Sequence, residues 1–513
     1  MKYPLGIQSF EKLRTGGFAY VDKTALVYQM AKAEQHFFLS RPRRFGKSLL
    51  LSTLEAYFLG KRELFKGLAI EQLEQDWLQY PVLHLDLNAE KYDSPAALEA
   101  VLDWHFRQWE LIYGRDENDT TPTQRFKSLI RKANEKTGMK VVVLVDEYDK
   151  PVLQAIGNPE LQDDYRSTLK AVFGVAKSMD AYIQFGLFTG VTKFSKVSVF
   201  SDLNNLTDIS MDERYAELCG ITEAEIHANF DSEVQLVAEK NGMTKEECYA
   251  SLKRCYDGYH FEAGTVGMYN PYSLLNTLER KRFKDYWFET GTPSYIVEVI
   301  KQHSYDLDRL TSEEVTADLL GSLDSIDKSP LPIIYQSGYL TIKGYDPEFG
   351  NYRLGFPNEE VERGFTKFLM LYYTPAGKDE GQRFITNFVK DVRAGQPEQF
   401  LRRLESFFAL GDYEVAGDAE LYFHNAVSLI FRMMGFYTEV ERHTTDGRMD
   451  MLVKTGDYIY ILEFKLDRSA DEALQQIDAK QYAAPFAADP RTLYKIGVNF
   501  SSRTRRVEGW KIG

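Results

Sequence analysis

Cysteine is scarce in this sequence, and its spacing argues against the common cysteine-based metal sites. The 513 residues include only Cys219, Cys248 and Cys255, and no two of them form a C-x-x-C pair. Structural zinc sites depend on closely spaced ligands of this kind, so we expect none here. A sparse and odd number of cysteines is also typical of a reducing compartment, which predicts a cytoplasmic protein.

Long apolar runs and an excess of positive charge are also missing. No uncharged apolar stretch approaches the ~18 residues that cross a bilayer, and the N-terminus lacks the apolar core of a signal peptide, so we expect no membrane partner. The formal net charge of −14 argues against a protein covered in basic surface for nucleic-acid binding, but does not exclude a local basic groove. The last eleven residues include Arg503, Arg505, Arg506 and Lys511, and we interpret them as a solvated tail.

The remaining composition is that of an ordinary globular protein with more than one domain. Hydrophobic residues make up 44% and charged residues 27%, and 513 residues exceed what one core usually organises. From the pattern of apolar runs we predict three parts, residues 1–220, 221–410 and 411–513.

The first 220 residues alternate short apolar runs with longer amphipathic stretches. The runs expected to form strands are residues 36–40, 81–87, 140–145 and 182–189. Strands separated by helical segments predict an α/β fold, in which a parallel sheet carries helices on both faces.

The rest of the chain is expected to form a mainly helical, winged-helix-like middle and a second α/β unit. The middle is predicted as helices over residues 222–320, short strands with turns over 330–354, and helices over 358–389 and 396–410. The last part is predicted as helix 418–434, strands 437–443, 449–454 and 458–465, helix 470–483 and strand 492–499.

A candidate phosphate-binding loop, residues 41–48 (RPRRFGKS), lies between the first expected strand and a helix. Its end matches the pattern G-x-x-x-x-G-K-[ST], whereas Arg41 stands in place of the first glycine. A tight loop that leads into a helix N-terminus binds phosphate through backbone amides. We expect Lys47 to pair with the β- and γ-phosphates of a nucleotide, Ser48 to ligate magnesium, and the three loop arginines to add positive charge.

A later apolar strand ends in two carboxylates that suit this loop. Residues 141–145 are β-forming and are followed by Asp146 and Glu147. We expect the strand to lie beside the phosphate loop, with Asp146 holding magnesium through water and Glu147 polarising the attacking water. Thr189 and Thr192 follow the next expected strand, and each is a candidate to sense the γ-phosphate, a simple turn being the alternative.

These motifs resemble those of the bacterial AAA-ATPase-like family. The resemblance covers nearly the whole chain and rests on residues 41–49, 145–151, 188–196, 201–206, 256–259 and 270–273. An arginine at the first loop position is a habit of that family. The resemblance implies an AAA-like P-loop ATPase fold for the first part of the chain. The residues it implies for ATP binding are Arg43, Arg44, Phe45, Gly46, Lys47, Ser48, Leu49 and Thr189.

Two further features are open to a structural or a functional interpretation. The aromatic segment 256–259 (YDGY) is expected either to stack on a nucleobase or to pack a lid on the ATPase core. His424 lies four residues after Glu420 on an expected helix, and we interpret it as a satisfied histidine and not as a metal ligand.

The last part of the chain carries its own set of charged residues. Asp450 precedes Glu463 by thirteen residues, and Lys465 follows two residues later. Strand geometry puts Glu463 and Lys465 on one face, and a hairpin brings Asp450 alongside. Two carboxylates then hold magnesium or manganese while the lysine activates water, which is the chemistry that cuts a phosphodiester. A salt bridge on an edge strand is the alternative, but charge on an otherwise apolar strand is costly unless it is used.

These three catalytic candidates match the PD-(D/E)XK nuclease pattern, and proteins of the AAA-ATPase-like family commonly end in such a domain. The last α/β unit is therefore expected to resemble a PD-(D/E)XK nuclease. The resemblance also implies an additional acidic metal ligand at Glu420, and Gln476 and Tyr482 match the helix that follows. It implies Mg²⁺ or Mn²⁺ at the site and nucleic acid as its partner, with cleavage as one of two outcomes because such domains can bind without cutting.

We therefore expect a protein that binds and hydrolyses ATP with Mg²⁺ and processes DNA or RNA through its last domain. One alternative is an ATP-switched module that binds nucleic acid or protein without cleavage. Another is a metal-dependent nuclease whose P-loop domain serves only structure or assembly. A homo-oligomer is compatible with the sequence. Turnover measured with and without DNA separates these hypotheses.

Overall fold

The computed structural model describes most of the chain. The described ranges are 1–33, 35–88, 90–193, 199–200, 203, 205–289, 295–303, 305–321, 329–373, 378–409, 419–435, 437–445, 448–504 and 506–513. Within them, the description leaves out the side chains of residues 289, 298, 301–302, 371–373, 378–382, 409, 419–420, 441–445 and 448–450.

The chain folds into two compact units. One consists of Met1–Val299 and Thr311–Val361, and the other of Ile300–Leu310 and Glu362–Gly513. The expected middle part, residues 221–410, contributes to both units. Its expected boundaries stay a prediction, and the one at residues 410 and 411 lies outside the described residues.

The first unit is built on a five-stranded parallel sheet with the order β2-β3-β4-β1-β5. Its strands are β1 His36–Ser40, β2 Val82–Asp86, β3 Val141–Asp146, β4 Ile183–Gly190 and β5 Leu206–Asp208. β4 pairs with β1 on one side and with β3 on the other. β4 therefore lies between β1 and β3 in the sheet. The end of β3 still reaches the phosphate loop, as expected, because Glu147 Oε1 lies 3.4 Å from Lys47 Nζ. The three-residue β5 was not predicted.

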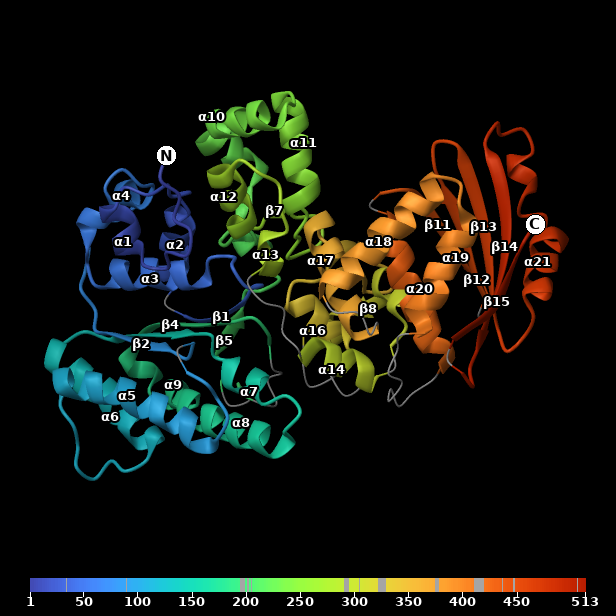
Figure 1. Ribbon diagram of the computed structural model, residues 1–513. Helices are drawn as coiled ribbons and strands as arrows, with labels where there is room; N and C mark the ends of the chain where they lie inside the picture. The colour runs from blue at the N-terminus through green and yellow to red at the C-terminus, as the bar shows by residue number, and fades with distance from the viewer. Residues whose placement is uncertain are drawn as a thin grey trace. The chain divides into compact units, whose positions relative to one another are not determined.

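Helices cover both faces of this sheet, as expected for the α/β class. Figure 1 shows α3 on one face and α5, α6 and α8 on the other. The helices are α1 Phe10–Thr15, α2 Thr24–Ala31, α3 Lys47–Phe58, α4 Ile70–Leu73, α5 Pro95–Tyr113, α6 Pro122–Thr137, α7 Lys150–Gln154, α8 Pro159–Phe173 and α9 Val175–Ser178. Short 3-10 turns are η1 Arg62–Phe65, η2 Asp180–Tyr182 and η3 Glu213–Tyr215. β3 is buried along its whole length, which explains its unbroken apolar sequence.

A helical subdomain follows, and capping residues determine where its first helices begin. Thr222 and Thr244 each accept a hydrogen bond from the backbone N–H three residues later, where a glutamate closes a capping box. The elements are β6 Ile221–Thr222, α10 Glu223–Asn241, α11 Lys245–Tyr256, β7 Met268–Tyr269, α12 Pro271–Arg280, α13 Tyr286–Glu289 and α14 Tyr295–Gln302.

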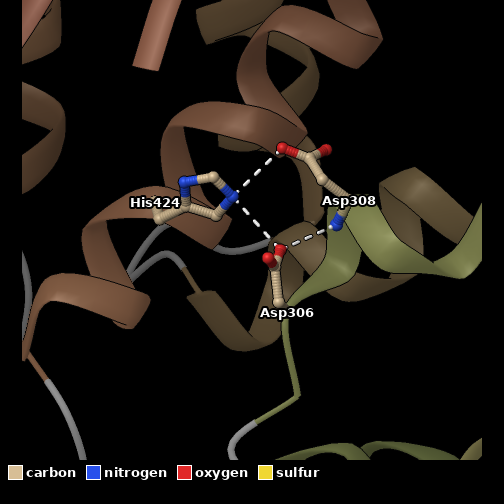
Figure 2. A group of neighbouring side chains, drawn as sticks. All are labelled: Asp306, Asp308 and His424. Carbon is tan, nitrogen blue, oxygen red and sulfur yellow. Dashed lines mark hydrogen bonds and ion pairs between the residues drawn. The ribbon is translucent and has the colours of Figure 1, made fainter. Parts of the chain in front are cut away.

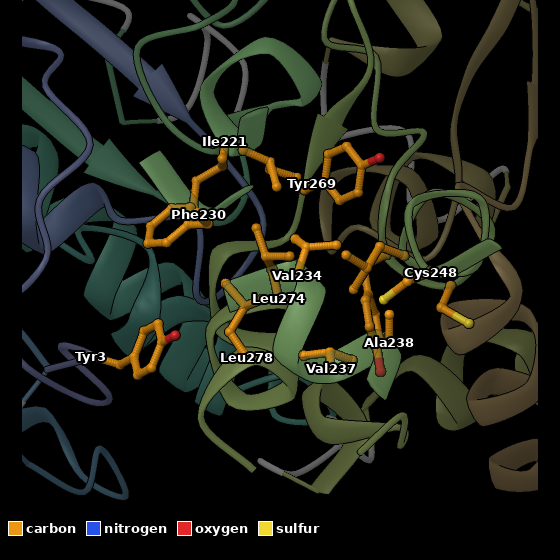
Figure 3. Close-up of a cluster of buried hydrophobic side chains, with 14 residues drawn as sticks. Tyr3, Ile221, Phe230, Val234, Val237, Ala238, Cys248, Tyr269, Leu274 and Leu278 are labelled. Carbon is orange, nitrogen blue, oxygen red and sulfur yellow. The ribbon is translucent and has the colours of Figure 1, made fainter. Parts of the chain in front are cut away.

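The core of this subdomain joins the start of the chain to α10, α11 and α12. Phe230, Val234 and Leu274 are buried in one cluster, and Figure 3 shows these side chains turned toward one another. Tyr3 belongs to the same cluster, and its hydroxyl donates to Glu233 at 2.8 Å. The N-terminal segment therefore packs against helices that lie more than 200 residues later in the sequence.

The winged part of the middle has a three-stranded antiparallel sheet of order β8-β10-β9. Its elements are η4 Leu307–Thr311, β8 Glu314–Thr316, α15 Ala317–Leu320, α16 Leu331–Gln336, β9 Thr341–Asp346 and β10 Asn351–Gly355. The first residues after Pro330 form helix α16, where the pattern predicted a strand. Prolines in the first turn are compatible with this helix, because the N–H groups there need no intrahelical acceptor.

The second unit ends in a mixed sheet of order β11-β12-β13-β14-β15. Its elements are α17 Glu359–Tyr373, α18 Lys378–Arg393, α19 Pro397–Ala409, α20 Ala419–Gly435, β11 Glu439–Thr445, β12 Arg448–Lys454, β13 Tyr458–Leu466, α21 Ala470–Ala479, η6 Ala484–Phe486, β14 Thr492–Ser501 and β15 Arg506–Ile512. Only β13 and β14 pair in parallel, with α21 between them in sequence. The interpretation of the last residues as a solvated tail is wrong, because β15 pairs with β14 and buries Val507.

None of the described helices combines the length and the apolar character that a membrane crossing requires.

Candidate functional site

The phosphate loop runs from the end of β1 into the N-terminus of α3. Gly46 has φ +99°, a left-handed conformation that favours glycine, and it is the residue directly before α3. The first N–H groups of an α-helix have no intrahelical acceptor, so they point toward the space in front of Gly46 and Lys47. Together with the helix dipole, they make this end of α3 a site for negative charge.

The Phe45 side chain and the Arg43 backbone anchor the loop to the helical subdomain. The Phe45 ring packs edge-on against the rings of Tyr259 and Phe261, with centroids 4.7 and 5.5 Å away. Trp287 Nε1 donates to the backbone oxygen of Arg43 at 3.1 Å. This packing agrees with the lid interpretation of the YDGY segment, because Tyr259 is used against the loop. Phe45 is buried, so only its main chain is free to face a phosphate.

Arg41 does not add to the phosphate site, contrary to the expectation for the three loop arginines. Its guanidinium is buried and donates to the backbone oxygens of Ser210 at 2.7 Å and Tyr215 at 3.2 Å. It also lies over the Phe261 ring, 3.8 Å from the centroid. Burial lowers the pKa of Arg41 to about 10, which still leaves it charged at neutral pH. Arg41 thus replaces the flexibility of a glycine with a buried hydrogen-bonded anchor.

Lys47 and Glu147 converge in front of α3. Their Nζ and Oε1 atoms are 3.4 Å apart, although β4 separates the two strands that lead to them. Lys47 Nζ also donates to the backbone oxygen of Arg41 at 3.0 Å, which holds its side chain across the loop. Glu147 has φ +52°, a strained conformation for a residue with a side chain. Parallel strands explain the convergence, because their carboxyl ends meet at one edge of the sheet.

Asp146 and Thr189 form a second contact at the same edge. Thr189 Oγ1 donates to Asp146 Oδ1 at 2.8 Å, and both residues are buried at the ends of adjacent strands. The candidate magnesium carboxylate and one candidate γ-phosphate sensor therefore touch directly. Thr192 lies farther along and binds Asp149, so the two threonines have different partners.

A cavity of about 940 Å³ opens in front of the loop. Among the expected nucleotide-site residues, those that line it are Arg43, Arg44, Gly46, Lys47, Ser48, Leu49 and Glu147. Phe45, Asp146 and Thr189 do not line it. The roles assigned to all of these residues stay predictions.

The cavity has further lining residues that sequence reasoning did not single out. Lys91 and Lys150 add positive charge, and Lys150 Nζ donates to Asn88 Oδ1 at 2.8 Å. Tyr272 is another lining residue, and the Arg44 guanidinium lies 5.3 Å from the centroid of its ring. Lys150 follows the Asp-Glu-Tyr-Asp run and Tyr272 lies in the Asn-Pro-Tyr-Ser motif. The motifs contained this signal, but no local pattern indicated that they face one cavity.

The C-terminal candidate residues lie on one face of β13. Lys465 Nζ is 2.6 Å from Glu463 Oε1 and donates to Gln476 Oε1 at 2.7 Å. Gln476 is on α21, which also packs on Ile459 and Ile461, so all four strand residues share the face that α21 covers. Glu463 has no exposed surface, and its Oε2 atom has no hydrogen-bond partner among the described residues. A buried carboxylate oxygen without a donor suits a divalent cation.

Two expected ligands lie partly outside the described part of this site. The backbone of Asp450 on β12 pairs with Glu463 in antiparallel register, as the expected hairpin requires. The side chains of Asp450 and of Glu420, which belongs to α20, are outside the described residues. Their convergence on a metal stays a prediction.

A third group of charged side chains lies in the second unit. His424 Nε2 on α20 is 3.1 Å from carboxylate oxygens of both Asp306 and Asp308, as Figure 2 shows. The three ligand atoms lie within 4.8 Å of one another and could hold a metal ion. Ser428 and Arg432 also contact Asp308, at 2.6 and 3.3 Å. The charges of Arg432 and a protonated His424 balance those of the two carboxylates. The interpretation of His424 as a satisfied histidine and not a metal ligand stays a prediction.

This cluster predicts a pH-dependent stability. Burial alone lowers the pKa of His424, but the ion pairs with Asp306 and Asp308 outweigh it and raise the pKa from 6.5 to about 9. A raised pKa stabilises the folded state fully below pH 6.5, and that contribution is lost as the pH rises through 9. We expect wild type to be more stable than His424→Gln at pH 6 by at most about 3 kcal/mol, with little difference at pH 10.

Calorimetric unfolding of both proteins at the two pH values measures this difference. A stability gap that is equal at pH 6 and pH 10 contradicts the protonated ion-pair cluster. If magnesium or zinc instead raises the melting temperature of wild type but not of His424→Gln, the cluster is a metal site.

Comparison with known proteins agrees with both halves of this description. Residues 4–200 match the family described as Predicted AAA-ATPase, and residues 418–510 match the PD-(D/E)XK nuclease superfamily. A relative from Azotobacter chroococcum mcd 1, named as an uncharacterized protein in the vnfD 5'region, is 36% identical over 524 residues, which span 100% of this chain and 98% of the relative. The chain therefore belongs to the AAA-ATPase-like proteins that carry a C-terminal domain of the PD-(D/E)XK nuclease superfamily.

Proposed function

We propose that the protein binds and hydrolyses ATP at the phosphate loop, and that its last domain is a metal-dependent site that acts on DNA or RNA. The observation that carries the proposal is the meeting of Lys47, Ser48 and Glu147 on one cavity at the N-terminus of α3. Of the charged residues on this cavity, five are basic and two acidic, which suits a nucleoside triphosphate. The basic residues are Arg43, Arg44, Lys47, Lys91 and Lys150, and the acidic ones are Asp93 and Glu147.

Different residues of the chain bind the phosphates, hold the metal ion and activate the water. Lys47 and the backbone amides of the loop bind the β- and γ-phosphates. Ser48, and Asp146 through water, would hold a magnesium ion. Magnesium, when bound with ATP, neutralises charge on the phosphates. Glu147 orients the attacking water and accepts its proton, and Thr189 keeps Asp146 in place through their hydrogen bond.

In the last domain, Asp450, Glu463 and Glu420 would hold Mg²⁺ or Mn²⁺. That ion supplies positive charge for a phosphate oxygen. Lys465 orients water through its ammonium group, and Gln476 fixes the direction of that group. An acidic protein engages nucleic acid in this way because the positive charge is concentrated at the site.

Incubating the purified protein with mixed DNA and RNA, with Mg²⁺ or Mn²⁺ and with or without ATP, tests the proposal. Phosphate release and loss of intact nucleic acid are the two readouts. ATP turnover with cleavage supports the proposal in full. Turnover with binding but no cleavage favours the ATP-switched module, and cleavage without turnover favours a nuclease with a structural P-loop domain.

Lys47→Ala is expected to weaken ATP binding tenfold or more, which corresponds to on the order of 1.4 kcal/mol. The reason is the loss of the ammonium group that faces the cavity from the helix N-terminus. Isothermal titration with ATP and magnesium measures the change. Lys61→Ala is the matched control, because Lys61 pairs with Glu11 at 2.6 Å and does not line the cavity. Equal ATP affinity in wild type and Lys47→Ala would remove the nucleotide assignment.

A further inference from the structure

A buried carboxylate lies between the candidate hydrolytic residues and the end of β4. Asp149 Oδ2 accepts hydrogen bonds from Thr192 N at 2.6 Å and Thr192 Oγ1 at 2.5 Å, and Oδ1 accepts from Val191 N at 3.3 Å. Asp149 has no exposed surface. A Cβ atom at Gly190 would lie 2.6 Å from Oδ1, so the close approach requires glycine there. Burial, and then the charge of Glu147, raises the pKa of Asp149 to about 6.

Residues next to Asp149 form further hydrogen bonds to the same segment, residues 189–192. Tyr148 donates its backbone N–H to Thr189 O at 3.0 Å and its hydroxyl to Thr192 O at 3.1 Å. Asp146 accepts from Thr189 Oγ1. The run from Asp146 to Asp149, which contains Glu147, is therefore bonded to residues 189–192 through Asp146, Tyr148 and Asp149.

Lys193, which directly follows this segment, is hydrogen-bonded to the winged region. Lys193 N donates to Gln336 Oε1 at 2.8 Å, and Gln336 Nε2 donates to Leu320 O at 2.6 Å. Gln336 is the last residue of α16 and only 7% exposed. Next to it, Ser337 Oγ lies 3.3 Å from the hydroxyl of Tyr295, a residue that lines the nucleotide cavity.

We infer that Asp149 and Gln336 are positioning residues for ATP hydrolysis, which hold the segment 189–193 from the nucleotide side and from the winged region. The inference rests on the proposed ATPase function. Neither side chain lines the cavity, so each acts through the segment and not on ATP. Gln336 lies in the winged region, outside the family match at residues 4–200. Through its hydrogen bond with Lys193, the winged region therefore contributes to the ATPase site.

This arrangement separates the chemical step from nucleotide binding. The groups that bind phosphate belong to the loop and α3. Among the described residues no hydrogen bond or ion pair joins Lys47 or Ser48 to Asp149 or Gln336, although the positive charge of Lys47 acts to lower the pKa of Asp149. Loosening the segment moves Thr189, and with it the Asp146 carboxylate and the neighbouring Glu147. We therefore expect kcat to fall while the KM for ATP changes little.

Steady-state ATPase kinetics of Asp149→Asn and Thr192→Val test the nucleotide side. Asparagine keeps the shape but turns a donor toward a backbone N–H, and valine removes only the hydroxyl. We expect kcat to fall roughly 10- to 100-fold in Asp149→Asn and less in Thr192→Val, with KM within about threefold of wild type. Thr192→Ser restores the hydroxyl and is expected to restore kcat.

Asp22→Asn is the matched control for a purely structural effect. Asp22 also accepts three hydrogen bonds, from Thr24 N at 2.8 Å, Thr24 Oγ1 at 2.6 Å and Ala69 N at 2.7 Å. It does not line the cavity, so its loss is expected to lower the melting temperature without changing kcat. Melting temperatures of all variants identify any that fail to fold.

Gln336→Leu and Gln336→Glu test the winged side. Leucine removes both hydrogen bonds of the side chain, whereas glutamate keeps the acceptor for Lys193 N. We expect kcat to fall in Gln336→Leu at unchanged KM, and to recover partly in Gln336→Glu. Wild-type kcat in folded Asp149→Asn and Gln336→Leu overturns the inference while the ATPase proposal stands. Absence of ATP turnover in wild type overturns the ATPase proposal itself, and the inference with it.

Discussion

Glu147→Gln is expected to bind ATP as wild type does and to hydrolyse it ~10²–10⁴-fold more slowly. Glutamine keeps the shape of the side chain but cannot accept a proton from water. Its position supports this role, since Glu147 lines the cavity beside Lys47, on a backbone with φ +52°. Strain of this kind persists where the surrounding structure holds it, as it does between β3 and α7.

Two measurements test the Glu147 prediction. Titration with ATP checks that binding is kept, and phosphate release under single-turnover conditions gives the rate of the chemical step. Glu160→Gln, in the exposed first turn of α8, is the control for an equal change of charge. Hydrolysis by Glu147→Gln at the parental rate means that Glu147 is not the base.

Asp450→Ala is expected to abolish cleavage of nucleic acid and to leave ATP hydrolysis unchanged. The backbone of Asp450 is paired with Glu463, whose buried carboxylate lies beside Lys465. Removing one of the three proposed anionic ligands weakens a divalent cation site strongly, whereas the phosphate loop belongs to the other compact unit. Magnesium or manganese is expected to support cleavage better than zinc, because the expected ligands are oxygens.

Asp457→Ala is the matched control for Asp450→Ala. Asp457 lies in the exposed turn between β12 and β13, in the same hairpin but away from Glu463. Cleavage of a labelled DNA or RNA and ATP turnover are measured for each protein. Cleavage that persists in Asp450→Ala contradicts the assigned metal site. An inactive wild type that still binds nucleic acid would favour the non-cleaving module.

The ATPase fold was predictable because its signals are local. Strand β1, the loop at Gly46 and helix α3 follow one another within about 25 residues, and β3 is an unbroken apolar run. Over such lengths, the spacing of apolar residues predicts which residues of each element are buried. The same holds for β12, β13 and α21, whose order and approximate ends the pattern predicted.

Two edge strands, β15 and β5, were not predicted, because they bury little apolar surface. β15 has charged and exposed residues at Arg506, Glu508 and Lys511, and Val507 is its one buried residue. An edge strand needs an apolar residue only where it faces the core, so its composition resembles that of a solvated tail. The short strand β5 was not predicted for a related reason, since three residues show too little periodicity to be recognised.

The sequence by itself identified the candidate residues of both sites, because Gly46-Lys47-Ser48, Asp146-Glu147 and Glu463-x-Lys465 each lie within a few residues of one another. Only the tertiary structure decided which distant residues support them. Asp149 meets Thr192 across 43 residues and Lys193 meets Gln336 across 143. Such contacts depend on strand order and on helix packing, with β4 inserted between β1 and β3. No local periodicity encodes that order, since it results from the way the whole sheet buries its apolar faces.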